Sequence, residues 1–329
     1  MRKRYILLVL AILAVVAGWS GFWFYAAGEV EKRLDLALEE FARDGMQVVC
    51  EDRTVGGYPF RMEVRCKTVV VVLADGSKVA NGPLRAVALV YNPRHIIVEA
   101  DAPLAARLAA VPVDLSGRWN LAQASLIFKG GTVASMAVSL QGVDAAAAGG
   151  FGAQKAAAER AELHVRRAPD KPDTTDIAVT LDKGSLAGAL FNADPFDAGV
   201  LVRLPDGTDW LAGREPPLAI IGMPIEVREA FISRDDARIT ANGVLTLGAD
   251  GYFAGDLEVT AAEPGRVAEL IRPFYPPDSA IPAAFQGALS GFGKKTTLNG
   301  QPAVSAKLTF REGGVRIGFI PIARMVPLF

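Results

Sequence analysis

The chain has 329 residues, of which 51% are hydrophobic, and its formal net charge at pH 7 is −1. Acidic and basic residues are interspersed along the sequence, so no basic face of the kind that binds nucleic acid is expected. Two cysteines and two histidines are too few ligands for the usual protein metal sites, and we expect neither a metal ion nor a cofactor.

The N-terminal segment is a candidate membrane span. Three basic residues at positions 2–4 precede 24 residues without a charge, residues 5–28. As a helix this segment would be about 36 Å long, enough to cross a hydrocarbon core of about 30 Å. The positive-inside rule then places the N-terminus in the cytoplasm and the bulk of the chain on the other side.

A cleaved signal peptide is the alternative to an anchor. Bulky aromatic residues at positions 22–25 precede the alanine pair at 26–27, where a signal peptidase requires small side chains. Aromatic side chains of this kind suit the interface of a membrane. We therefore expect residues 1–28 to be an uncleaved transmembrane anchor.

Residues 29–43 have the pattern of an amphipathic helix. Val30, Leu34, Leu38 and Phe41 recur at helical spacing, with charged residues on the opposite side. The pattern predicts a juxtamembrane helix that continues the anchor and packs on the following domain. Binding to a helical partner is the alternative.

Cys50 and Cys66 are both outside the membrane in this topology, where a disulfide is permitted. The residues between them include turn-forming glycines, and Cys66 falls on the apolar side of an alternating segment. A bridge across this short loop would stabilise the fold by about 3 kcal/mol in the chain-entropy model. Two free thiols are the alternative.

Period-two alternation recurs over residues 44–329 and predicts a mainly β domain built from antiparallel strands. Its clearest instance is a hairpin over residues 237–260, with a turn at 248–251. The turn-forming residues at 168–173 are a candidate division into two halves. Further strands are expected at residues 161–166, 177–181, 304–310 and 315–319, and short helices at 103–110 and 264–271.

The chain offers no catalytic motif. Residues 291–296 resemble a phosphate-binding loop, but Ala288 and Lys295 occupy the positions that require Gly and Ser or Thr. No Gly-x-Ser-x-Gly elbow is present, and a catalytic triad has no support in the pattern. We therefore expect a protein that is not an enzyme, with an enzyme acting on envelope polymers as a remote alternative.

Three segments together resemble a known bacterial family. They are the aromatic-ended anchor, the glycine-rich residues 313–322, and the motif between the cysteines. That motif comprises Gly57, Tyr58, Pro59, Phe60 and Arg61. The combination resembles DUF2125, a family of unknown function. The resemblance implies an inner-membrane protein of a Gram-negative bacterium, with its bulk in the periplasm and no catalytic residues to carry over.

The hairpin at 239–259 also resembles the strands of AsmA-like envelope proteins. That resemblance implies a large curved antiparallel sheet whose concave apolar face holds the acyl chains of phospholipid or another lipid. The candidate groove residues, which would otherwise be plain core, are Ile239, Leu245, Leu247, Phe253, Leu257, Val304, Leu308 and Phe310. An envelope scaffold that docks a protein partner through residues 29–43 and 320–329 is the alternative function.

Overall fold

The computed structural model describes residues 2–109, 113–149, 152–171, 173–188, 191–205, 220–276 and 278–328. It divides into two compact units, Met1–Ser116 and Gly117–Phe329. The division therefore falls earlier than residues 168–173, where the sequence suggested it. Residues 168–171 and 173 instead lie between two paired strands, β12 (Gln154–Arg167) and β13 (Thr174–Gly188). Turn-forming residues occur both in linkers between domains and in turns between paired strands, so composition does not distinguish the two.

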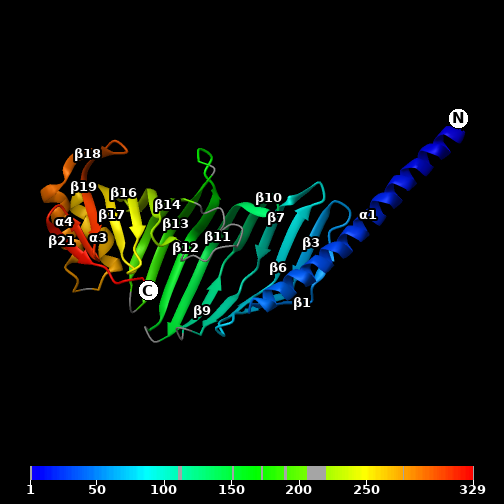
Figure 1. Cartoon of the computed structure of the whole chain (residues 1–329), viewed down its shortest axis with the longest axis horizontal. Helices are drawn as coiled ribbons and strands as arrows, with labels where there is room; N and C mark the ends of the chain where they lie inside the picture. The colour runs from blue at the N-terminus through cyan, green and yellow to red at the C-terminus, as the bar shows by residue number, and fades with distance from the viewer. Residues whose placement is uncertain are drawn as a thin grey trace. The chain divides into compact units, whose positions relative to one another are not determined.

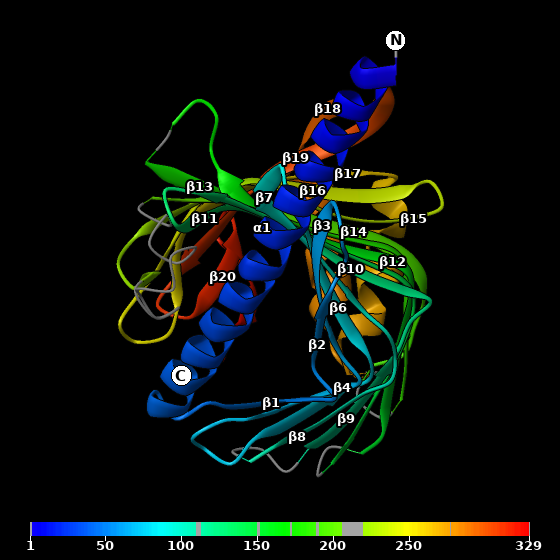
Figure 2. The same ribbon diagram turned by 90° about the vertical axis from the view of Figure 1, so that its right-hand side faces the viewer.

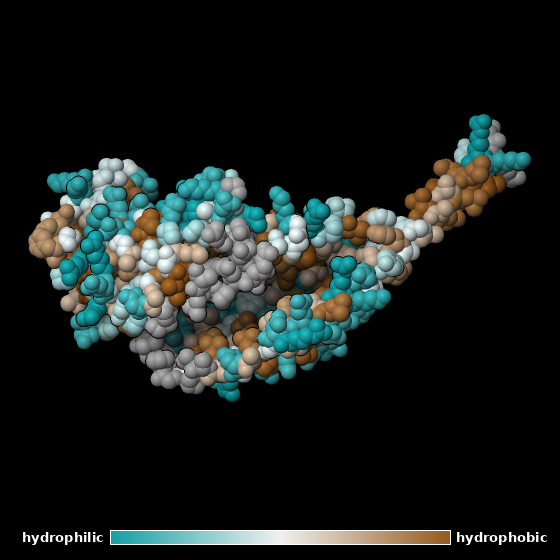
Figure 3. Space-filling view, viewed as in Figure 1, coloured by the Kyte–Doolittle hydropathy of each residue, from teal (hydrophilic) through white to brown (hydrophobic). Residues whose placement is uncertain are grey.

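Unit 1 begins with a single unbroken helix, α1 (Arg2–Arg43), which merges the predicted anchor and the predicted juxtamembrane helix. Proline is absent from this stretch, so nothing interrupts its backbone ladder. Its 42 residues make it about 63 Å long. It is long and apolar enough to cross a membrane, and Figure 3 shows hydrophobic side chains along its outer part.

The strands of unit 1 pair in antiparallel fashion: β1 with β4, β4 with β5, β5 with β8, β2 with β3, β3 with β6 and β6 with β7. Figure 2 shows β1 leaving the end of α1. The strands are β1 (Gln47–Glu51), β2 (Thr54–Gly56), β3 (Arg61–Cys66), β4 (Thr68–Val72), β5 (Lys78–Asn81), β6 (Leu84–Leu89), β7 (Asn92–Ala100) and β8 (Leu104–Leu108). A further strand, β9 (Val113–Arg118), carries the chain into unit 2.

Two sequence predictions for unit 1 have different outcomes. The disulfide is confirmed: Cys50 and Cys66 are bonded, with their Cα atoms 5.2 Å apart, and they join β1 to β3. The prediction of a helix at 103–110 is wrong, because residues 104–108 form β8 and pair with β5. The Ala and Leu residues there have high helix propensity, and the non-local ladder overrides it.

The strands of unit 2 are also antiparallel, and each strand from β10 to β16 pairs with the next one in the chain (Figure 1). After β17, β19 pairs with β17, β18 and β20, and β20 pairs with β21. The strands not yet given are β10 (Leu121–Lys129), β11 (Thr132–Gly149), β14 (Ala193–Pro205), β15 (Pro224–Arg234), β16 (Ala237–Leu247), β17 (Phe253–Ala262), β18 (Lys294–Leu298), β19 (Gln301–Arg311), β20 (Gly314–Ile317) and β21 (Ile320–Arg324). The mainly β prediction and the 237–260 hairpin are confirmed.

Helical turns are inserted between β17 and β18. They comprise η2 (Pro264–Arg266), α3 (Val267–Ile271), η3 (Arg272–Phe274) and α4 (Ile281–Phe292), which confirms the helix expected at 264–271. Val267 of α3 and Leu289 of α4 are fully buried, and they pack on sheet residues such as Val259, Ala261 and Ile317. This cluster is the hydrophobic core of unit 2.

Candidate functional site

One face of the unit 2 sheet is apolar across neighbouring strands. Met136 of β11 lies opposite Val165 of β12, which lies opposite Ile177 of β13, which in turn lies opposite Val202 of β14. Directly paired residues of antiparallel strands point to the same side of the sheet. The register therefore gathers these side chains into a continuous row.

Two parallel rows extend the same face. One joins Val138, Leu163, Val179 and Val200, and the other joins Leu140, Ala161, Leu181 and Ala198. The alternate residues are mostly polar and point to the opposite side. Among them are Glu162, His164, Arg166, Thr180 and Asp182. The sheet is therefore strongly two-sided.

Only part of the apolar face is closed by helices. The contacts of α3 and α4 lie with β15, β16 and β19 to β21, and the ring of Phe274 in η3 meets Phe196 of β14 at their margin. Among the described residues of unit 2, no helix covers the face of β10 to β13. Val179 there is 43% exposed and its apolar neighbours are only half-buried, whereas Leu289 is fully buried.

We call this uncovered part the open apolar face. Its residues are Leu126, Met136, Val138, Leu140, Leu163, Val165, Ile177, Val179, Leu181 and Val200. Each is half-buried except Val179, which is exposed. An apolar surface of this extent on the outside of a protein is typical of a site that binds an apolar ligand or partner.

The eight groove residues expected from the sequence lie on the other part of this face. Ile239 and Leu257 belong to the buried core, and Leu245, Leu308 and Phe310 pack against it. Leu247 is 3% exposed, while Phe253 and Val304 are half-buried. Because the helices close this region, these residues have the surroundings of core, and the candidate ligand surface moves to β10–β14.

The motif of residues 57–61 lies in unit 1, in the turn that leads into β3, and packs on α1. The indole of Trp19 donates to the carbonyl of Pro59 at 3.0 Å, and the indole of Trp23 donates to the carbonyl of Arg61 at 3.1 Å. Gly57 has a φ of +100°, and a Cβ there would lie 2.7 Å from the carbonyl oxygen of Arg61. The turn therefore requires glycine.

Aromatic contacts reinforce this junction. The Ser20 hydroxyl donates to the carbonyl of Val16 at 2.7 Å, so the hydroxyl of Tyr58 donates to Ser20 at 2.8 Å. The Tyr58 ring lies edge-on to Trp23, with 5.6 Å between centroids, and stacks on Phe24. We call this set of contacts the helix clasp. Its sequence signal is the Trp19/Trp23 pair, which lies on one side of a helix.

Residues 23–325 match the sequence profile of DUF2125, described as an uncharacterized protein conserved in bacteria. The chain belongs to the DUF2125 family. No curated protein and no solved structure matches it, so the resemblance to AsmA-like proteins is not shown. The matched part of this DUF2125 chain contains the open apolar face and the motif of residues 57–61.

The polar side of the unit 2 sheet in this DUF2125 protein holds a buried arginine. Arg203 is 5% exposed and its guanidinium bonds the carboxylates of Asp176, at 2.7 Å, and Asp170, at 2.8 Å. The hydrogen bonds from Arg203 lower the pKa of Asp170 to about 2. Both carboxylates are occupied by this one cation, so the cluster fastens the β12–β13 turn to β14. Scattered charges along the chain do not predict this cluster.

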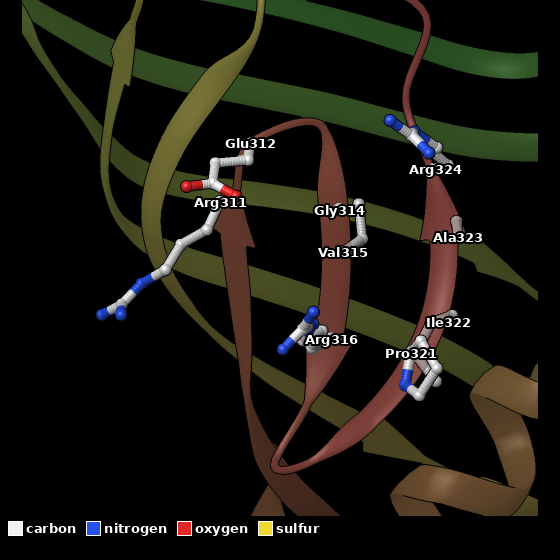
Figure 4. A pocket seen from close by; sticks show the side chains of 9 residues that line it. All are labelled: Arg311, Glu312, Gly314, Val315, Arg316, Pro321, Ile322, Ala323 and Arg324. Atoms are coloured by element: carbon white, nitrogen blue, oxygen red, sulfur yellow. The ribbon is translucent and has the colours of Figure 1, made fainter.

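A pocket of about 460 Å³ lies on the C-terminal hairpin of the DUF2125 chain. Arg311, Glu312, Arg316 and Arg324 are among its lining residues. In Figure 4 the three guanidinium groups point in different directions and do not converge on one point. The pocket therefore lacks the focused set of donors that would hold a phosphate or carboxylate group.

Proposed function

We propose that this DUF2125 protein is a single-pass protein of the bacterial inner membrane that binds the acyl chains of a lipid on its open apolar face, without catalysis. The N-terminus would lie in the cytoplasm, α1 would cross the membrane, and the strands of both units would lie in the periplasm. The length and apolar character of α1 support the anchor. The Cys50–Cys66 disulfide suits an oxidising compartment.

One observation carries the proposal: no described helix of unit 2 covers the open apolar face. Five strands, β10 to β14, contribute to it. At a strand spacing of about 4.8 Å they form an apolar strip about 19 Å wide. Ten methylenes removed from water on such a strip would contribute about 8 kcal/mol toward offsetting the loss of ligand freedom on binding.

The test compares two double variants of the full chain, extracted from its native membrane. Leu163→Asn/Val179→Asn places two amides on the open apolar face at directly paired positions. Glu162→Asn/Thr180→Asn makes the same change at the adjacent pair on the opposite side of the same strands. Native mass spectrometry with lipid extraction then measures the lipid retained, and circular dichroism measures the fold.

We expect stoichiometric lipid with the wild-type chain and with the Glu162/Thr180 variant, and strongly reduced lipid with the Leu163/Val179 variant at unchanged dichroism. A wild-type chain free of lipid, or equal retention by the two variants, would refute lipid binding at this face. A Leu163/Val179 variant that unfolds would show that these residues are core.

A second function is favoured by exposed apolar residues at the C-terminus. Val326 is 82% exposed and Leu328 is 62% exposed, and Phe329 lies outside the described residues. These side chains and the exposed face of residues 29–43 fit a scaffold that docks an envelope protein. Deleting residues 325–329 should abolish co-purification of such a partner and leave lipid retention unchanged.

A further inference from the structure

One end of unit 1 exposes a group of aromatic side chains. Phe60 is 64% exposed, Tyr58 is 48% exposed, and Tyr91, in the turn between β6 and β7, is 78% exposed. The backbone N–H of Val90 donates to the carbonyl of Phe60 at 3.0 Å, which places the two turns side by side. Exposed aromatic rings from two adjacent turns form one surface.

The helix clasp fixes the depth of this surface relative to α1. If Arg4 marks the cytoplasmic side, a hydrocarbon core of about 30 Å takes up about 20 helical residues and ends near Phe24. Trp19 and Ser20, which bond Pro59 and Tyr58, lie within that length. The turn that they hold must therefore lie at the outer boundary of the same bilayer.

The backbone of the turn is suited to a place with little water. Carbonyl groups there must be satisfied by the protein itself. The carbonyls of Pro59 and Arg61 accept from indole N–H groups of α1, and that of Phe60 accepts from Val90. Pro59 has no N–H to satisfy. These three carbonyls are thus bonded within the protein while the rings of Tyr58 and Phe60 remain exposed.

We propose that Tyr58, Phe60 and Tyr91 form a membrane-contact surface, seated in the outer interfacial layer of the phospholipid bilayer that α1 spans. This inference rests on the anchor in the proposed function and is independent of lipid binding in unit 2. Tyrosine, an aromatic side chain with one polar end, is among the residues that favour this layer, and the ring of Phe60 adds apolar contact area. The surface and the span together hold unit 1 against the membrane at two points.

Spin labels on introduced cysteines test this surface. The two native cysteines are bonded to each other, so an added cysteine is the one free thiol of the chain. Phe60→Cys and Tyr91→Cys report on the surface, and Val15→Cys, at a site 72% exposed on α1, reports on the span. The full chain is placed in vesicles of phosphatidylethanolamine and phosphatidylglycerol, and relaxation of each nitroxide by oxygen is compared with relaxation by a water-soluble nickel chelate.

Leu73→Cys is the matched control, an exposed apolar position at the other end of unit 1. Leu73 is 40% exposed and precedes Ala74, whose Cβ would lie 2.9 Å from a Cβ on Gly45, just beyond α1. Because α1 extends about 35 Å from Ser20 to Arg43, this position lies far from the clasp. Its label should be relaxed by the nickel chelate.

We expect the labels at positions 60, 91 and 15 to be relaxed mainly by oxygen, which concentrates in lipid. If the nickel chelate relaxes the labels at 60 and 91 as it does the label at 73, while oxygen relaxes the label at 15, the contact surface is refuted and the span is not. A label at 15 that is open to the nickel chelate would overturn the span and the surface together. If Phe60→Cys does not fold, Tyr91→Cys gives the same decision.

Discussion

The difference between the closed and the open parts of the apolar face can be measured by truncating one leucine in each. Leu289 of α4 is fully buried in the core, so Leu289→Ala removes well-packed atoms and leaves a cavity, at a cost of about 4 kcal/mol. Leu163 of β12 is only half-buried. Leu163→Ala loses about half of the transfer free energy and leaves no closed cavity, so its cost should be about 1 kcal/mol.

Amide hydrogen exchange of β16 and β17 peptides in the full chain measures these costs, because it reports the opening free energy of unit 2 apart from that of unit 1. Leu163→Ala should lower this free energy by about 1 kcal/mol, and Leu289→Ala by about 4 kcal/mol. Equal losses in the two variants would refute the reasoning, since Leu163 would then be part of a closed core. When lipid is bound, Leu163→Ala should lower the opening free energy by a larger amount.

Three further predictions concern the disulfide, the ion pair of Arg203 with Asp170, and the helix clasp. Replacing both Cys50 and Cys66 with serine should lower the free energy of unfolding of unit 1 by about 3 kcal/mol, measured by urea denaturation with and without reductant. Asp170→Asn should lower the melting temperature at pH 7, and its difference from wild type should vanish as the pH falls from about 4 to 2, because a carboxylate with a depressed pKa stabilises the fold only while it is ionised. Trp23→Phe keeps an aromatic ring but leaves the carbonyl of Arg61 without its indole donor, and should cost about 1 to 2 kcal/mol, seen as faster hydrogen exchange in β3.

Local patterns of the sequence predicted several local features of the structure. Alternation over residues 237–260 predicts the β16–β17 hairpin, and Pro264 at the start of its helical turn predicts the segment ending at Ile271. The disulfide follows from location and turn chemistry. These features depend on residues close together in the chain.

Features that depend on distant residues were not predictable in this way. Alternation shows on which side of the sheet Leu257 lies, but the helices that cover it come from residues 264–292, and no pattern in β17 shows where they pack. The prediction of a helix at 103–110 is wrong for the same reason, since pairing with β5 determines the conformation of residues 104–108. The helix clasp joins residues about 40 positions apart, Trp19 and Pro59, through hydrogen bonds that periodicity does not encode.

The unbroken course of α1 makes it a rigid rod as well as the proposed anchor. A helix without a hinge transmits any change in its angle along its whole length, and the clasp and the β1 contacts fix it to the sheet of unit 1. A transmembrane helix adjusts its tilt to the thickness of the surrounding bilayer. With α1 as the proposed anchor, a change in membrane thickness would therefore act through the helix on the strands of unit 1, so the orientation of these strands would follow the physical state of the surrounding lipid.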